Sequence, residues 1–133
     1  MTPHAFDTPD QIEAFAPAIA WHLGEFAKGG ESTAQDFIDQ IQAERIQLWY
    51  VEDQGKIVCA LLSRISADRL KTCEITHCAG EGYRHWVGLW GIVEAWAKDI
   101  GCKRIKAITR PGWERPLKTF DMVKTHVVLE KDI

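Results

Sequence analysis

The sequence has no long apolar run and no excess of basic residues. Its 133 residues carry 16 Lys and Arg against 19 Asp and Glu, a formal net charge of −3. A chain with this balance does not attract nucleic acid through its overall charge. No stretch approaches the roughly 20 apolar residues of a membrane-spanning helix. The first ten residues also lack the pattern of a signal peptide. We therefore expect a cytoplasmic protein without membrane or nucleic-acid partners.

The four cysteines form no CxxC pair. Cys59, Cys73, Cys78 and Cys102 each lie in or beside an apolar segment, so we expect small buried thiols in a reducing compartment rather than disulfides. A metal site is not expected either. His77 and Cys78 are neighbours on a predicted strand, where adjacent side chains point to opposite faces.

What is present suits one globular domain. The chain is 46% hydrophobic and 26% charged, ordinary values for a single domain with its own core. We expect residues 1–46 to form N-terminal helices and residues 47–133 to form a sheet with its core helices. Thr8 predicts a helix start, Pro17 a kink, and Ser32 or Thr33 the cap of a second helix.

Strand patterns dominate the middle of the chain. Residues 47–52 and 56–65 predict a hairpin around a turn at 53–55. Residues 71–78 predict a third strand. We expect its odd positions, Cys73, Ile75 and His77, to face one way and Thr72, Glu74, Thr76 and Cys78 to face the other.

The C-terminal half predicts a strand, a helix and a further strand in succession. An apolar stripe indicates a helix over about 86–100, ended by Gly101. A strand over 103–109, a short helix over 111–120 and a last strand over 123–130 follow. The helix between the third and fourth strands implies a parallel crossover. We therefore expect an α/β (α+β) three-layer fold, with a central mixed sheet flanked by helices.

Two stretches resemble a known family. The residues Ala-Lys-Asp-Ile-Gly-Cys-Lys-Arg-Ile at 97–105 look like the end of the main helix and the next strand of the GNAT superfamily of N-acetyltransferases. Residues 110–117 are similar to an R-x-G-W-x-R-x-L pattern in small GNAT-like proteins of phages and prophages. The likeness covers residues 47–131. It implies a GNAT-like fold, acetyl-CoA or CoA as cofactor and, in the phage subgroup, a virion location with virion proteins as partners.

The resemblance also points to the cofactor loop. In active members a strand-to-helix turn, R/Q-x-x-G-x-G/A, holds the pyrophosphate of acetyl-CoA on backbone N–H groups. Here Glu81 would repel a phosphate, and Arg84 and Trp86 stand where Gly or Ala normally allows a close approach. The loop is therefore degenerate by comparison, although Arg84 and His85 offer an alternative phosphate contact. The candidate cofactor-binding residues are those of this turn: Gly80, Gly82, Arg84, His85 and Trp86.

The proton-transfer residues of the family are also replaced. Leu117 stands at the position of a tyrosine that protonates the leaving thiolate, and Arg110 stands at that of an asparagine one turn earlier. Neither is a proton donor at neutral pH. Together with the loop, this implies a non-catalytic or weakly catalytic binding or structural component. The alternative is an active acetyl-CoA-dependent N-acetyltransferase acting on an unknown amine.

Two side chains on the third strand are candidate general bases. Glu74 and His77 lie where the family counterpart lines the cleft, and either type can take a proton from an amine. The two residues alternate to opposite faces of the strand, so at most one faces the cleft. The alternatives are a surface carboxylate for Glu74 and a packed core histidine for His77.

Tryptophans supply the candidate partner contacts. Trp96 lies off the apolar stripe to which Trp90 belongs, so we expect it to be partly exposed. Trp113 is flanked by Arg110 and Arg115, a setting for stacking a ligand or anchoring a partner. The alternative for Trp113 is that it fixes the last helix on the sheet. Homo-oligomer formation remains open.

Overall fold

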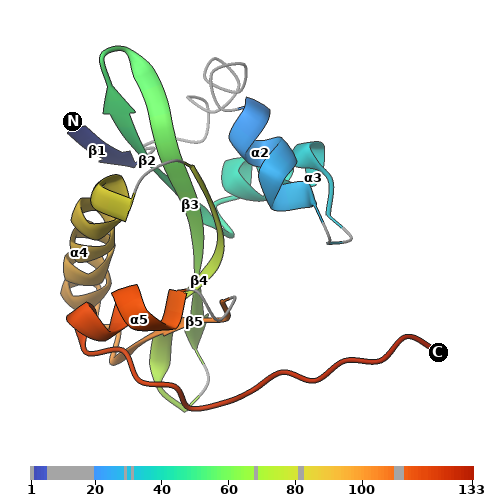
Figure 1. Cartoon of the computed structure of the whole chain (residues 1–133), viewed down its shortest axis with the longest axis vertical. Helices are drawn as coiled ribbons and strands as arrows, with labels where there is room; N and C mark the ends of the chain where they lie inside the picture. The colour runs from blue at the N-terminus through green and yellow to red at the C-terminus, as the bar shows by residue number, and fades with distance from the viewer. Residues whose placement is uncertain are drawn as a thin grey trace.

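Figure 1 shows a computed structural model of the chain, with a mixed sheet between two groups of helices. The residues that it describes are 2–5, 20–28, 30, 32–67, 69–80, 83–109 and 113–133. For residues 2–5, 83–87 and 114 the description covers the backbone only. The expected helix start at Thr8 and kink at Pro17 lie outside these ranges.

The sheet has five strands in the order of the sequence. They are β1 (Thr2–Ala5), β2 (Gln47–Asp53), β3 (Lys56–Ala67), β4 (Lys71–Gly80) and β5 (Arg104–Ala107). The first four pair antiparallel, whereas β5 pairs parallel to β4. The mixed sheet and the parallel crossover were predicted, and both are confirmed. Strand β1 was not predicted, so the expectation of helices alone over residues 1–46 is wrong at this end.

The helices lie on both faces of the sheet. They are α2 (Ala20–Ala27), α3 (Ala34–Gln42), α4 (Tyr83–Asp99), α5 (Glu114–Leu117) and the 3-10 helix η3 (Lys118–Phe120). Thr33 caps α3 as expected. Its hydroxyl accepts the N–H of Asp36, and the Asp36 carboxylate accepts the N–H of Thr33 at 2.8 Å. This reciprocal pairing satisfies two N–H groups that the helix itself leaves free.

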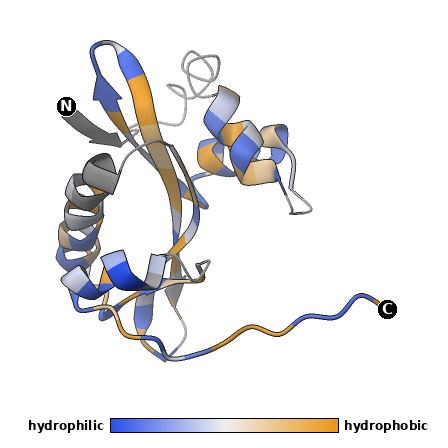
Figure 2. Cartoon of the chain, viewed as in Figure 1, coloured by the Kyte–Doolittle hydropathy of each residue, from blue (hydrophilic) through white to orange (hydrophobic). Residues whose placement is uncertain are grey.

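Two cores hold the three layers together. One lies between the sheet and α4 and includes Trp90, so the expected core position of this residue is confirmed. The other lies between the sheet and the pair α2 and α3. Figure 2 shows that hydrophobic residues concentrate on the central strands between these layers. None of the helices in the described ranges is both long and apolar enough to span a bilayer.

Helix α4 ends where the sequence indicates but begins earlier. It closes at Asp99, followed by Gly101 with a positive φ of 91°, a backbone conformation that glycine adopts without strain. Its start at Tyr83 is three residues before the expected position. Only residues 81–82 separate β4 from the helix.

Strand β4 carries a β-bulge at Thr76. Leu62 on β3 lies opposite His77, and the next residue, Ser63, lies opposite Ile75. Thr76 is therefore an extra residue with no partner of its own across the ladder, and the alternation of side chains changes phase at this point.

Because of the bulge, two predictions about the faces of β4 are wrong. His77 was expected to share a face with Cys73 and Ile75. Those two residues belong to the core under α4, whereas His77 packs on the α2 and α3 side. Glu74 lies opposite Arg64 on β3, and the regular alternation of β3 puts this pair on the same face as His77. The two candidate bases thus share a face.

The predicted last strand over 123–130 is absent. Residues 122–133 carry no secondary structure, and Figure 1 shows them running away from the domain as an extended tail. Five large apolar side chains of this tail are exposed: Val123, Val127, Val128, Leu129 and Ile133.

Candidate ligand cleft

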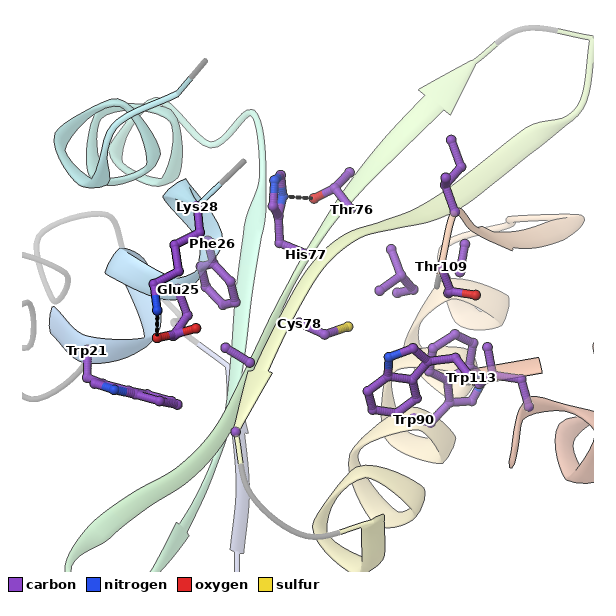
Figure 3. Close-up of a pocket in the computed structure, with 16 residues that line it drawn as sticks. Trp21, Glu25, Phe26, Lys28, Thr76, His77, Cys78, Trp90, Thr109 and Trp113 are labelled. Atoms are coloured by element: carbon purple, nitrogen blue, oxygen red, sulfur yellow. Dashed lines mark hydrogen bonds and ion pairs between the residues drawn. The ribbon is translucent and has the colours of Figure 1, made fainter. Parts of the chain in front are cut away.

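A cleft opens where β4 and β5 part. Their parallel pairing ends at Ile75 and Ala107, while β4 continues to Gly80. In the space beyond lies a pocket of about 420 Å³ (Figure 3). One wall is residues 75–80 of β4, and the facing wall is residues 107–109 with Trp113. The edge of β4 that faces this space is not paired with β5, so its backbone amides are available to a ligand.

Trp90 supplies a donor at the wall of this cleft. The residue is only 2% exposed, yet its indole Nε1 has no hydrogen-bond partner among the residues that the structure describes. Figure 3 shows the nitrogen on the side of the ring nearer Cys78. An unsatisfied buried N–H costs about 1–3 kcal/mol. Such a group at a cavity wall is a natural partner for a ligand acceptor.

Cys78 lies in the cleft and is exposed, contrary to the expectation that all four cysteines are buried. The bulge changes the alternation just before it and leaves it on the open stretch of β4. Although solvent reaches the residue, desolvation by the surrounding walls raises the pKa of its thiol far above the usual range. The thiol is therefore neutral at pH 7 and a poor nucleophile. Cys59, Cys73 and Cys102 are buried free thiols as expected.

His77 lines the cleft, and its imidazole is packed against other rings and uncharged. Its ring lies 5.9 Å from that of Phe26 and 4.9 Å from that of Phe37. Its Nδ1 is 3.0 Å from the hydroxyl of Thr76. Burial lowers its pKa below the usual 6.5, which leaves the imidazole uncharged at pH 7. The ring can accept a proton, but aromatic contacts restrict its movement.

Glu74 is not brought into the cleft. It does not line the pocket, and its carboxylate accepts hydrogen bonds from the Arg64 guanidinium at 3.1 Å. Of the two candidate bases, only His77 borders the cavity. No group of three potential metal ligands occurs in the described portion of the chain.

Helix α2 provides a wall that the sequence did not reveal. Trp21, 57% exposed, lines the pocket with Glu25, Phe26 and Lys28. The Glu25 carboxylate is paired with Lys28 at 2.6 Å. The available signal was the placement of Trp21 off the apolar face that includes Phe26, since a large aromatic outside the core stripe indicates a contact surface.

The arrangement of sheet and helices matches solved acetyltransferases. A predicted acetyltransferase from Clostridium acetobutylicum, solved with acetyl-CoA, has a TM-score of 0.71 and 13% identity, covering 98% of this chain and 95% of that one. Glucosamine-6-phosphate N-acetyltransferase from Arabidopsis thaliana has a TM-score of 0.72 and 14% identity, covering 99% of each chain. An aminoglycoside acetyltransferase from an uncultured soil metagenomic sample, in complex with sisomicin, has a TM-score of 0.72 and 10% identity, covering 99% of this chain and 95% of that one.

This chain has the GNAT acetyltransferase fold. The expected fold class is therefore confirmed. No protein-family model matches the sequence, and no curated protein gives a significant match. Because identities are this low, the structural likeness establishes the fold and leaves the activity to be argued from the cleft.

The loop that connects β4 to α4 in this GNAT-fold chain is short. Gly80 has a positive φ of 146°, and a Cβ there would approach the Cβ of Cys59 to 2.4 Å. This contact with β3 requires a glycine at position 80. Gly82 lies outside the described residues. Residues 84–86 form part of the first turns of α4 rather than the loop, so their backbone N–H groups include those that a helix leaves unpaired.

The predicted partner-contact residues separate into two places. Trp96 is half-buried and meets Trp49 edge-on, with ring centroids 5.1 Å apart. Trp113 is half-buried, packs on the core under α4 and also lines the cleft. Arg115 is exposed, and Arg110 lies outside the described ranges.

Proposed function

We propose that this GNAT-fold chain binds CoA or acyl-CoA in the cleft between β4 and β5 and acts as a binding or structural component with weak or no acyl transfer. The observation that carries the proposal is the buried indole N–H of Trp90 at the wall of that cleft, which has no hydrogen-bond partner in the described part of the chain. If Trp90 served only to pack the core, an aromatic ring without this N–H would stabilise the fold more, because no buried donor would lack a partner.

The residues present fit such a ligand. The arm that joins the diphosphate of CoA to its thiol contains amides, which suit both Trp90 and the unpaired edge of β4 over residues 76–80. The N-terminus of α4 lies just beyond Gly80 and favours an anion such as a diphosphate. Bound acetyl-CoA would supply an activated acyl group and a thiolate leaving group. The chain's own groups would hold and orient it.

The groups in the cleft that could transfer protons support the proposal of weak or no acyl transfer. Leu117 is a buried apolar side chain, so it cannot protonate a leaving thiolate. The raised pKa of the Cys78 thiol keeps it protonated, and two aromatic rings restrict the movement of His77. The cleft thus has groups that bind a ligand and few that move a proton.

Calorimetric titration with CoA and acetyl-CoA tests the proposal directly. We expect saturable binding of both, and a thermal stabilisation that grows with ligand concentration. The companion assay follows release of the CoA thiol with a panel of primary amines. Absence of binding at millimolar ligand would overturn the proposal, and rapid transfer to an amine would overturn the weak-transfer part of it.

The second candidate is an active N-acetyltransferase for a cationic amine. The observation in its favour is the α2 wall, where the Glu25 carboxylate and the exposed face of Trp21 both suit an ammonium group. Neutral His77 would then accept the proton of the amine. Loss of transfer in both Glu25→Gln and His77→Gln, with CoA binding retained, would establish this candidate over the first.

The resemblance to phage-encoded proteins extends the binding role to association with a virion. The half-exposed aromatic Trp113 and the exposed Arg115 are the groups that we assign to such a contact. Mass spectrometry of purified particles from the source tests this association, and absence of the chain from them removes it.

A further inference from the structure

Thr76 and His77 are consecutive residues of β4 whose side chains contact each other. On a regular strand, two consecutive side chains point to opposite faces. The bulge at Thr76 interrupts this alternation, because the extra residue of a bulge changes the direction of the side chain beside it. The Thr76 hydroxyl therefore lies 3.0 Å from Nδ1 of the His77 ring (Figure 3). Both residues are half-buried and line the cleft.

The Thr76 hydroxyl has a second neighbour, which decides the direction of this hydrogen bond. It donates to the backbone carbonyl of Leu62 on β3, at 3.4 Å. A hydroxyl has one hydrogen to donate and two lone pairs that accept. While that hydrogen is directed at Leu62, the hydroxyl oxygen can only accept from the His77 ring. Nδ1 must then carry the ring hydrogen.

The two neutral tautomers of His77 differ by one hydrogen bond. With the hydrogen on Nδ1, the ring donates to Thr76 and Thr76 donates to Leu62, so two bonds form in a chain and polarise each other. With the hydrogen on Nε2, the hydroxyl has to donate to Nδ1 and gives up the carbonyl. The contact to Leu62 is long for an O–H···O bond, so we expect a modest preference for protonated Nδ1, roughly threefold.

The favoured tautomer leaves a free lone pair on Nε2 of His77. This nitrogen has no hydrogen-bond partner among the residues that the structure describes. The ring packs against Phe26, which lines the pocket together with Trp21 and Glu25 of α2. A ring nitrogen without a hydrogen accepts a hydrogen bond, whereas a protonated one only donates. The ligand group that suits His77 therefore carries an N–H.

We propose that Thr76 is a positioning residue for His77, and that its hydroxyl favours the tautomer in which Nε2 accepts an N–H of an amine on the α2 side of the cleft. The proposal rests on the second candidate function, in which an amine is the acceptor. When that amine gives up a proton, the N–H bonding pair stays on its nitrogen and the proton binds the lone pair of Nε2. The resulting imidazolium keeps its Nδ1–H on the Thr76 oxygen, a bond that the charge strengthens.

Nitrogen–proton correlation spectra of the histidine rings test this role in the full chain at neutral pH. They distinguish the two tautomers, and the signals missing from His77→Gln identify the ring. We expect the wild-type ring to be protonated mainly on Nδ1. Thr76→Val keeps a β-branched side chain of similar shape but removes the hydroxyl, so the ratio of Nδ1-protonated to Nε2-protonated ring should fall roughly threefold. Thr76→Ser retains the hydroxyl and should restore the ratio.

The tail contains a matched control pair. The hydroxyl of Thr125 lies 2.7 Å from Nδ1 of His126, and both residues are exposed. Within the described ranges, this hydroxyl has no second acceptor comparable to the Leu62 carbonyl. Thr125→Val should leave the tautomer ratio of His77 unchanged. Circular dichroism of each variant checks that the fold is retained.

The amine assay supplies a second readout. In the release of CoA thiol with primary amines, kcat should fall roughly threefold in Thr76→Val and recover in Thr76→Ser. The KM for the amine should change little, because Thr76 acts through His77 and does not contact the amine. A structural defect alone would not be corrected by a hydroxyl in the smaller side chain of Thr76→Ser.

The outcomes separate this proposal from the proposed function. A wild-type ring protonated mainly on Nε2 would overturn it, and so would a folded Thr76→Val variant with the wild-type tautomer ratio. These spectra are recorded without CoA, so they decide the role of Thr76 whether or not calorimetry detects CoA binding. Absence of transfer to every amine would overturn the second candidate function, and with it the role of Thr76 in proton transfer.

Discussion

Gly80 and Cys59 face each other across β3 and β4 at a separation that leaves no room for a Cβ on Gly80. The ladder pairs these two residues directly, and an added Cβ would lie 2.4 Å from the Cβ of Cys59 and 2.5 Å from its Cα. This contact brings the end of β4 against β3 just before the chain enters α4. The open stretch of β4 that lines the cleft is therefore anchored at its far end by a glycine.

Gly80→Ala should destabilise the fold strongly. The clash with backbone atoms and the positive φ of 146° both act against any side chain, and we expect a loss of about 3 kcal/mol in the free energy of unfolding. Urea denaturation measures it. Gly91→Ala is the control, because a Cβ there meets nothing within 4 Å inside α4 and should stabilise by about 0.5–1 kcal/mol. Equal effects at both sites would contradict the role of the close contact.

Trp90→Phe separates binding from stability. The change keeps an aromatic ring in the core but removes an N–H that has no partner among the described residues, so we expect little or no loss of stability from the missing donor. CoA affinity should fall about tenfold, the effect of one hydrogen bond of roughly 1.4 kcal/mol. Calorimetry with the wild type and the variant gives both numbers. Trp96→Phe, away from the cleft lining, should leave affinity unchanged.

The indole N–H of Trp90 should also report the contact spectroscopically. In a nitrogen–proton correlation spectrum, the signal missing from Trp90→Phe identifies this group. We expect it to shift on addition of CoA, because it gains an acceptor. Binding of CoA without movement of this signal would mean that the ligand uses the cleft but not this donor, whereas no binding at all would remove the proposed function itself.

Local signals in the sequence were sufficient for most of the fold. The apolar stripe of α4 repeats over several turns, the turn before Lys56 joins two strands, and Thr33 meets the requirement of a helix cap. Each of these is determined within a few residues. The tail was mispredicted because its alternation indicates a strand whatever lies beside it, while a strand exists only with a neighbour.

The cleft was less accessible to sequence reasoning. A one-residue bulge at Thr76 decides which face His77 and Cys78 occupy, and no residue type at that position distinguishes a bulge from a regular strand. The unpartnered nitrogen of Trp90 likewise depends on what surrounds the ring in three dimensions. The resemblance pointed to the third strand, which lines the pocket, but only the geometry shows on which face each of its side chains lies.

Histidine burial predicts a stability that falls in mild acid. Burial lowers the pKa of His77 below its usual 6.5, so between these two values the unfolded chain binds the proton more readily than the folded one. Its contribution is complete above pH 6.5 and is lost as pH falls toward the folded pKa. Chemical denaturation at pH 7.5 and pH 5.5 should show this loss, and His77→Gln should reduce it. An unchanged difference would contradict the assignment to His77.

Ser63→Ala should cost more than the deletion of an ordinary surface hydroxyl. Ser63 is fully buried, accepts the indole N–H of Trp49 at 3.0 Å and donates to the side-chain carbonyl of Gln47 at 2.8 Å. Removing the hydroxyl leaves a second buried indole N–H without its partner, and we expect a loss of about 1–3 kcal/mol. Thermal denaturation measures it. Adding Trp49→Phe removes the indole N–H that has lost its partner. Trp49→Phe should therefore reduce the free energy of unfolding less in the Ser63→Ala variant than in the wild type. A strictly additive double variant would show that the indole N–H of Trp49 does not depend on Ser63.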